Sequence, residues 1–595
     1  MSQPMRRRPT APSAVIPEVA ARYLPISRWL PAYPRAWMRP DLIAAVTSWG
    51  VMVPVALAYA GLAGVPPELG LVTAFAAMAA YAVFGTSRHL KVTVSSTMAV
   101  MSASVVADLA GGDPAAYLVF TAALALTVGV MLVAAGLAHL GFISDFLTKS
   151  VVTGFIIGVA ITIIIGQLPK ILGVPGLDGS LPEQVVQLVS ELPDTNPYTL
   201  AVGLISLVII LGLRRISRRI PGPLVVLVLG IIAVSMLDLA SYDVSVVGEV
   251  ETGVPLPSIP SIPLTSIPYL ILGAAGIVFL AVGESVGAAR AYAAQRGYQI
   301  DADQEMIALG GANLASGLFG GFTADASLSQ TATAESAGAR SQLSSLITAG
   351  LILATAVLLA PLFQNLPEAV LGAIVIAATV GLIDIGEMRR YWAWRRTDFA
   401  IAVTAMVGVL LTTVLTGMIV AVLLSVLLLL YRASRPYVAI LGRMAGRAAA
   451  FGDLARHPDA QPIQRLVIVR LDAPLYFFNA NVAKAEIMQI VDAQEPPPLG
   501  VLIDLAATAD LDVTTADMLF ELVGELRARS IEVAVAQVKG AVRDRLRKTG
   551  LMDELGEHHA YPSIDSAVDD FGCGWPAATS VVASVAASDA EAPLQ

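Results

Sequence analysis

The chain has 595 residues, of which 56% are hydrophobic and only 14% carry a charge, and its mean hydropathy is +0.73. These values exclude an ordinary soluble enzyme, because apolar runs of about 20 residues recur, each long enough to cross a hydrocarbon core of about 30 Å. The net charge of −9 gives no reason to expect a nucleic acid as partner, and the single cysteine, Cys573, excludes an intramolecular disulfide. The composition therefore predicts a polytopic helical membrane protein.

The apolar segments fill residues 41–435, after a polar and aromatic arm at residues 1–40 that does not resemble a signal peptide. We count about fourteen such segments, several of them short or interrupted by proline or glycine. Arginine clusters lie before, between and at the end of these segments, at residues 6–8, 214–219, 389–396 and 432–435. Because basic loops stay on the cytoplasmic side, we expect both termini to be cytoplasmic and the protein to lie in the cell (inner) membrane.

The composition after Arg435 changes to that of a soluble domain. The stretches RLVIVRLDAPLYFFN and LGVLIDLAA indicate buried strands, and TADMLFELVGELRARS indicates an amphipathic helix. Strands alternating with helices predict a small cytoplasmic α/β domain at residues 461–572. We expect residues 436–460 to be a linker and the Ala/Ser-rich residues 573–595 to be a disordered tail.

Two polar interruptions occupy corresponding places in the two halves of the membrane part. They are HLKVTVSSTMAVMSASVV (His89–Val106) and FTADASLSQTATAESAGARSQ (Phe322–Gln342). Each offers a short extended piece, then hydroxyls, then a helix too short to span. Paired discontinuous segments indicate an inverted-repeat transporter with its site near mid-membrane. Half-helix N-termini aim unpaired N–H groups at the site, so the pattern predicts an anion.

At these interruptions the chain resembles the sulfate permease family of anion transporters. The resemblance rests on DLIAAVTSWGVMVPVALAYAGLAGVPPELGL, FGTSRHL, VVTGFIIGVAITIIIGQLPKILG and ESVGAARAYAAQRGYQIDADQEMIALGGANLASGLFGGF. The soluble part resembles a STAS domain through LVIVRLDAPLYFFNAN, VLIDLAATADLDVTT and VKGAVRDRLRKTGLMDELG. The family implies an all-α membrane domain of fourteen segments arranged as a 7+7 inverted repeat, with a core domain, a gate domain and a cytoplasmic STAS domain. It also implies homodimers, elevator-like movement and small anions as substrates.

The resemblance also implies where the substrate binds. The site is expected where the two half-helices meet, next to Tyr59 of the first segment. The implied substrate-binding residues are Tyr59, Val94, Ser95, Ser96, Thr97, Ala326, Ser327, Leu328, Ser329 and Gln330.

The chain departs from the family pattern at this site. Gln330 stands where many relatives have arginine, Asp325 replaces a small or hydroxyl residue, and Val55 replaces a glutamine. We expect an isolated buried acid to be protonated, paired or solvated, and our hypothesis is that Asp325 pairs with Lys91 across the repeats. The alternative is that Lys91 reaches cytoplasmic water beside Arg88.

Glu284 ends the apolar run LILGAAGIVFLAVGE and is the other intramembrane acid. It resembles an acid that many relatives carry and that is implicated in coupling. We interpret it as a proton-coupling residue, together with Asp325 and Lys91, and we keep Na+ as an alternative coupling ion. The alternative role is that of a helix-end acid in contact with cytoplasmic water. We expect no cofactor and no metal site.

Thr514 lies near a strand-to-helix turn of the soluble domain. Related anti-sigma-factor antagonists are phosphorylated at this position, so Thr514 is a candidate regulatory site. A helix-capping threonine is the alternative interpretation, and the one we favour.

The sequence therefore predicts a secondary active transporter of a small inorganic or carboxylate anion, proton-coupled and elevator-type, and not an enzyme. Because an arginine is missing, a monoanion or a small carboxylate is favoured. The expected partners are the anion, the lipid bilayer, a second copy of the chain and a regulatory protein at the STAS domain. The alternatives are an uncoupled anion channel or exchanger of the same fold and a membrane-tethered STAS sensor.

Overall fold

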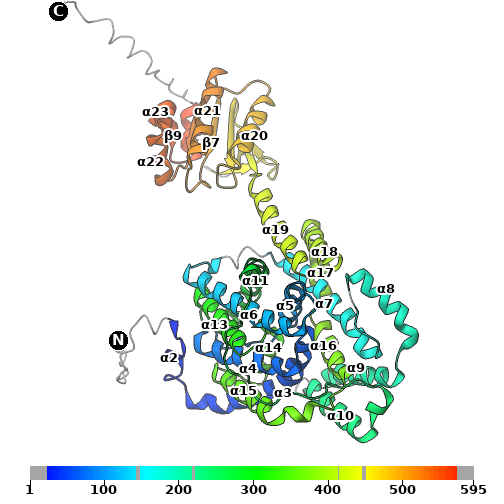
Figure 1. Cartoon of the computed structure of the whole chain (residues 1–595). Coiled ribbons are helices and arrows are strands. Elements are labelled where there is room, and N and C mark those ends of the chain that lie inside the picture. The colour runs from blue at the N-terminus through cyan, green and yellow to red at the C-terminus, as the bar shows by residue number, and fades with distance from the viewer. Residues whose placement is uncertain are drawn as a thin grey trace, which may run out of the picture. The chain divides into compact units, whose positions relative to one another are not determined.

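The computed structural model describes residues 23–142, 148–177, 179–216, 221–412, 414–444 and 450–572. The expected disordered tail and most of the expected N-terminal arm lie outside these residues. The chain divides into two compact units, residues 1–425 and 426–595 (Figure 1). The first is helical, and the second contains the main β-sheet.

The first half of the helical unit ends in a long loop before residue 267. Its main elements are α3 (Met38–Leu62), α4 (Pro67–Phe84), β1 (Val92–Thr93), α5 (Ser96–Ala110), α6 (Pro114–Leu137), α7 (Lys149–Leu172), α8 (Leu181–Glu191), α9 (Pro197–Ile216) and α10 (Gly222–Leu237). Five of these helices are long and apolar enough to span a membrane, namely α3, α4, α6, α7 and α9. Helices α5 and α10 are shorter.

The second half repeats this order, and its polar break again lies just before the third segment. Its elements are α11 (Ile267–Ala281), the π-helical turn η6 (Val282–Val286), α12 (Gly287–Arg296), α13 (Ala302–Leu318), β2 (Asp325–Ala326), α14 (Leu328–Ser336), α15 (Leu343–Ala354), α16 (Glu368–Val380), α17 (Ile385–Trp394), α18 (Arg396–Leu411) and α19 (Val414–Ala433).

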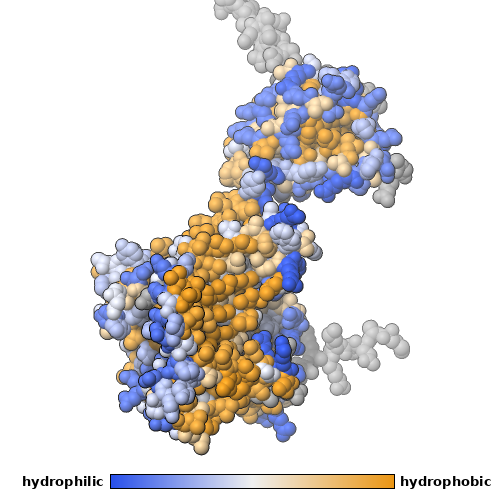
Figure 2. Space-filling model, turned by 90° about the vertical axis from the view of Figure 1, so that its right-hand side faces the viewer, coloured by the Kyte–Doolittle hydropathy of each residue, from blue (hydrophilic) through white to orange (hydrophobic). Residues whose placement is uncertain are grey.

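Eight helical stretches in the described residues are long and apolar enough to cross a membrane. Six further segments, α5, α10, α13, α14, α18 and α19, are shorter, broken or less apolar. Together they supply the fourteen segments that the sequence predicts. Figure 2 shows a broad hydrophobic face on this unit, and large apolar side chains of α9 and α10, such as Val208 and Met236, are exposed. Such a face suits contact with lipid.

Close helix packing depends on glycine at several positions. A Cβ atom at Gly310 of α13 would lie 2.7 Å from the carbonyl oxygen of Gly129 on α6, and one at Gly154 of α7 would overlap the Ala402 carbonyl of α18. Larger residues would force these helix pairs apart. Small residues at such contacts are typical of helices packed in a membrane.

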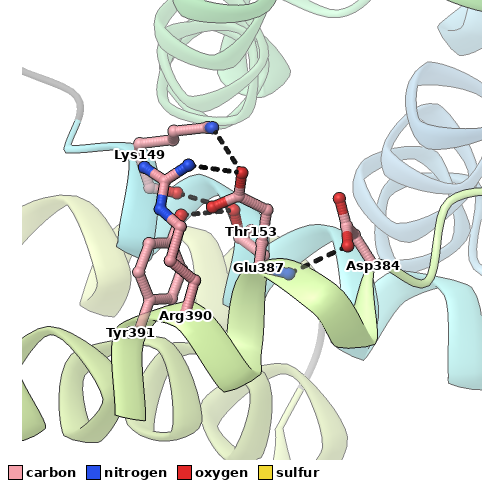
Figure 3. A network of polar contacts seen from close by, with 6 residues as sticks. All are labelled: Lys149, Thr153, Asp384, Glu387, Arg390 and Tyr391. Atoms are coloured by element: carbon pink, nitrogen blue, oxygen red, sulfur yellow. Dashed lines mark hydrogen bonds and ion pairs between the residues drawn. The ribbon is translucent and has the colours of Figure 1, made fainter. Parts of the chain in front are cut away.

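The short helix α17 is tied to α7 by a polar network (Figure 3). Lys149 Nζ and Arg390 Nη1 donate to Glu387 Oε1 at 2.9 and 3.0 Å, and the hydroxyls of Thr153 and Tyr391 lie 3.1 Å apart. These contacts hold α17 against the N-terminal part of α7.

The second unit is an α/β domain, as the sequence predicts. Its strands are β3 (Val438–Met444), β4 (Phe451–Asp453), β5 (Ala460–Gln461), β6 (Leu466–Leu471), β7 (Gly500–Asp504), β8 (Glu532–Ala536) and β9 (Ala560–Tyr561). The sheet order is β4-β3-β6-β7-β8-β9, with β5 paired to β3, and β6 to β9 run parallel. Its helices are α20 (Ala480–Asp492), α21 (Val513–Ala528), α22 (Gly540–Lys548), α23 (Leu551–Leu555) and α24 (Ile564–Gly572).

The predicted linker at residues 436–460 is wrong. Strand β3 begins at Val438 and pairs antiparallel with β6, from Val438 opposite Leu471 to Leu441 opposite Ile468. Its first residues are mostly buried, so they belong to the core of the soluble domain. The sheet thus begins five residues after α19 ends.

Candidate functional site

The two polar breaks meet in a short antiparallel ribbon. Val92 of β1 lies opposite Ala326 of β2, and Thr93 lies opposite Asp325. The ribbon leads into α5 on one strand and into α14 on the other. Residues more than 230 positions apart in the chain are therefore joined by backbone hydrogen bonds, and the two half-helices begin next to this junction.

Polar side chains from neighbouring helices hold the chain that leads into β2. Asn313 on α13 donates to the Ala324 carbonyl and accepts from the Ala324 N–H, both at 2.9 Å. Phe322 N donates to Thr73 Oγ1 at 3.0 Å, and its carbonyl accepts from Ser316 Oγ at 2.6 Å. Non-helical backbone at this depth needs such partners, because lipid offers none.

The N-terminus of α5 is buried. Val94, Ser95, Ser96 and Thr97 are between 0% and 8% exposed, and no side chain caps the helix. Tyr59 on α3 is 7% exposed and its hydroxyl faces Ser96. Free N–H groups of a first helical turn attract negative charge. The structure thus brings Tyr59 and the first-half site residues together.

The N-terminus of α14 is more open. Ser327 Oγ accepts from Gln330 N at 3.4 Å, while Leu328 and Ser329 are exposed. Gln330 is 2% exposed, and its Oε1 atom has no hydrogen-bond partner. Ala326 is buried in the ribbon. The expected site residues of the second half therefore lie around the first turn of α14, and some of them are exposed whereas others are buried.

Glu284 and Asp325 are neighbours at the π-helical turn. Ser285 Oγ donates to Asp325 Oδ1 and accepts from Ala326 N, the latter at 3.0 Å. Glu284 Oε2 and Asp325 Oδ2 are buried without a hydrogen-bond partner, and the two carboxyl groups interact electrostatically. Single-turn π-helical segments often mark functional sites. Glu284 does not end a helix, because α12 continues to Arg296, so the helix-end interpretation is wrong.

Both interpretations of Lys91 are wrong. Its ammonium donates to Ser344 Oγ at 2.7 Å and to Ser345 Oγ at 2.8 Å, and none of the ion pairs among the described residues joins it to Asp325. It is 1% exposed, so it does not reach cytoplasmic water. The ribbon register explains the first error, because Thr93 lies opposite Asp325.

Thr514 lies in the second unit, outside the anion site. It is exposed at the second position of α21, and the side chain that caps this helix is that of Asp512, whose Oδ1 accepts from Thr515 N at 2.8 Å. The favoured capping interpretation of Thr514 is therefore wrong. Its regulatory role stays a prediction.

Titratable groups of the second unit lie in ordinary structural settings. Burial raises the pKa of Asp504 at the end of β7, although Ala506 N donates to its carboxylate. Burial lowers the pKa of His559, which is 2% exposed. In the described residues, no group of three or more His, Cys, Asp or Glu side chains could hold a metal ion.

Sequence reasoning missed several residues that build the site. Asn313, Ser285, Ser344 and Ser345 all bind groups of the two breaks. The available signal was a buried polar residue in an otherwise apolar or small-residue helix, but such residues most often bind only within their own helix.

Family models match both units. The sulfate permease family model matches residues 38–405, and the STAS domain model matches residues 457–567. The chain belongs to the sulfate permease family. A protein of Mycobacterium tuberculosis named "Probable sulfate transporter" is 35% identical over 91% of this chain and 96% of its own length. Sulfate transporter 3.1 of Arabidopsis thaliana is 28% identical, over 92% of this chain and 86% of its own length.

Two solved structures of transporters share the fold. The murine solute carrier 26 member A9 anion transporter, in its inward-facing state, aligns with a TM-score of 0.86 at 22% identity, over 95% of this chain and 96% of that one. The transmembrane domain of a cyanobacterial bicarbonate transporter aligns with a TM-score of 0.58 at 24% identity, over 66% of this chain and 98% of that one. The fold class, a multi-pass transporter domain followed by a STAS domain, is confirmed.

Proposed function

We propose that this member of the sulfate permease family is a secondary active, proton-coupled transporter of a small inorganic or carboxylate anion. The observation that supports it most is the ribbon between β1 and β2, which places the N-termini of α5 and α14 at one junction. The uncapped first turn of α5 offers backbone N–H groups and the Ser95, Ser96 and Thr97 hydroxyls to an anion.

The substrate class follows from the charges near this junction. Residues 94–97 and 326–330 include no lysine or arginine, and the Asp325 carboxyl group lies in β2. A second negative charge on the substrate increases its repulsion from this carboxyl group. We therefore propose a monoanion or a small carboxylate, although the relatives at 35% and 28% identity are named for sulfate.

Proton coupling is proposed for the pair Glu284 and Asp325. Two negative charges side by side in a buried place are unfavourable, and one proton held between the carboxyl groups removes that repulsion. Proton loading would also lower the negative charge that an entering anion meets. Anion and proton would then bind together and be released together. Na+ would be the coupling ion if it neutralised the pair instead.

Orientation and assembly complete the proposal. Arginine clusters around α17 and at the end of α19 favour the cytoplasmic side of the cell membrane, and we therefore propose that both termini are cytoplasmic. We propose an elevator in which the unit formed by the ribbon and its half-helices moves against the remaining helices. We further propose a homodimer with a regulatory STAS domain.

Proteoliposomes that contain the full chain test the coupling. We expect nitrate or bicarbonate uptake to be faster with an inward proton gradient, and Glu284→Gln to lose this acceleration. Glu249→Gln, a change in an exposed loop, is the matched control and is expected to behave as wild type. A wild-type uptake rate that does not depend on the proton gradient would indicate an uncoupled channel or exchanger. Uptake driven only by a sodium gradient would assign coupling to Na+.

A further inference from the structure

Lys91 is a buried cation without a carboxylate partner. It is 1% exposed and is among the largest fully buried side chains of the protein. Its ammonium donates to Ser344 Oγ and Ser345 Oγ, and none of the ion pairs within the described residues includes it. Burial among neutral oxygens disfavours the charged form of a lysine, and an anion bound nearby favours it. Such buried lysines are costly inside a membrane protein and usually have a function.

The backbone of Lys91 belongs to the anion site. Ser327 N, at the N-cap of α14, donates to the Lys91 carbonyl at 2.8 Å. Lys91 N donates to Thr331 Oγ1 at 3.0 Å, one turn further along α14. The residue is thus fixed against the first turn of α14, while its side chain extends to the first turn of α15. Its position relative to the site is set by hydrogen bonds on both sides.

The carboxyl groups around Lys91 have other partners. Asp41 accepts from Arg340 N at 2.7 Å, from Ser341 Oγ at 2.7 Å and from Tyr33 OH at 2.9 Å. It does not contact the Lys91 ammonium, although its negative charge attracts that ammonium through space. Glu284 and Asp325 lie at the π-helical turn, where Ser285 binds Asp325. No carboxylate therefore cancels the lysine charge by direct contact within the described residues.

We propose that Lys91 is a specificity-determining residue of the anion site, which sets how well the site accepts a second negative charge. This inference rests on the proposed function. The ammonium acts through space, and it does not touch the substrate. For a separation of roughly 10 Å and an effective dielectric constant of about 20, one positive charge strengthens binding of a monoanion about tenfold and of a dianion about a hundredfold.

A purely structural role predicts something different. If Lys91 only ties β1 to α15, its loss lowers stability and weakens all anions by a similar factor. If its charge acts on the substrate, the free-energy loss for a dianion is twice that for a monoanion. The ratio of divalent to monovalent affinity therefore separates the two roles.

The experiment measures binding of nitrate and sulfate to the purified full chain by titration calorimetry, alongside its thermal midpoint. Lys91→Gln keeps hydrogen-bonding groups for both serines but removes the charge, and we expect the sulfate-to-nitrate affinity ratio to fall about tenfold. Lys91→Arg keeps the charge and should keep the ratio. Ser345→Ala removes one acceptor without changing charge, so it should lower the thermal midpoint and leave the ratio unchanged. Lys149→Met, at an exposed lysine, is the control.

Two outcomes overturn the inference separately from the proposed function. If the sulfate-to-nitrate affinity ratio is unchanged in Lys91→Gln and the wild-type chain still binds nitrate, the role of Lys91 is refuted and the proposed function is not. If Lys91→Gln does not fold, a ratio that changes in Lys91→Arg or Ser345→Ala refutes it, because neither variant alters the charge. Wild-type protein that binds neither anion refutes the proposed function and this inference with it.

Discussion

The two half-helices have corresponding places in the chain, but their first turns differ. Helix α5 has 15 residues and begins among buried hydroxyls with no side-chain cap. Helix α14 has nine residues, is capped by Ser327 and exposes Leu328 and Ser329. The approach to α5 includes a buried lysine, and the approach to α14 includes a buried aspartate. Two similar frameworks therefore supply different chemistry.

The difference suggests a division of roles between the halves. The α5 turn is held in a dry environment, which favours strong interaction between its N–H groups and an anion. The α14 turn is reached more easily, and it lies next to the Glu284 and Asp325 carboxyl groups that we propose hold the coupling proton. We interpret the first half as the anion-holding side and the second half as the coupling and access side. The following changes test this comparison.

Asn313→Ala should have the largest effect. The change leaves the N–H and carbonyl of Ala324 without partners in a dry interior, and we expect a loss of about 3–5 kcal/mol in the free energy of unfolding. Anion binding should be lost with it, because the ribbon depends on this segment. Denaturant unfolding of the detergent-purified chain measures the change. Asn365→Ala, at a surface contact to Ser235, is the control. Equal effects in both variants would contradict the role of Asn313.

Ser285→Ala should have an intermediate effect. It removes the donor to Asp325 Oδ1 and the acceptor of Ala326 N, so we expect a loss of about 1–3 kcal/mol in stability. Dependence of uptake on a proton gradient should also weaken, since the Asp325 carboxyl is no longer fixed beside Glu284. Ser104→Ala on α5, which removes only a bond to the Val100 carbonyl, is the control. A Ser285→Ala variant with normal coupling would show that this hydroxyl is not needed there.

The matched pair Ser95→Ala and Ser327→Ala should have the smallest effects, of different kinds. Ser327→Ala removes a helix cap, so we expect a loss of about 0.5–1 kcal/mol in stability. Ser95 caps nothing, so Ser95→Ala should leave stability nearly unchanged but weaken nitrate binding. Thermal unfolding and titration calorimetry measure the two quantities. The reverse pattern would show that the two first turns have exchanged the roles assigned above.

Most of the fold could be predicted from the sequence. The apolar run Leu118–Leu137 forms one membrane helix within α6, and the strands after residue 465 lie where their apolar runs indicate. The start of the soluble sheet was missed because YVAILGRM is a short apolar run that follows the last apolar helix after only the five residues RASRP. So close to the membrane part, a short apolar run can be assigned to a linker as easily as to a strand.

Part of the geometry at the candidate site could be predicted. The hydroxyl-rich breaks identified both half-helix N-termini, because non-helical backbone inside a membrane protein needs polar partners close by. The partner of Lys91 could not be predicted, since it depends on the register of a two-residue ribbon and on the packing of α15 against β1. The partnership of Ser285 with Asp325 similarly depends on a π-helical turn, and the extra residue of such a turn leaves no signal in hydropathy.

The ribbon has a mechanical consequence. Since Val92 and Ala326 are paired through their backbones, the two walls of the junction cannot separate without breaking hydrogen bonds that nothing in a hydrocarbon environment would replace. A gate that opens by splitting these walls is therefore disfavoured. We expect an anion held there to change sides only when the enclosing helices slide as a block, and a disulfide that joins this block to α7 or α16 would stop transport without preventing anion binding.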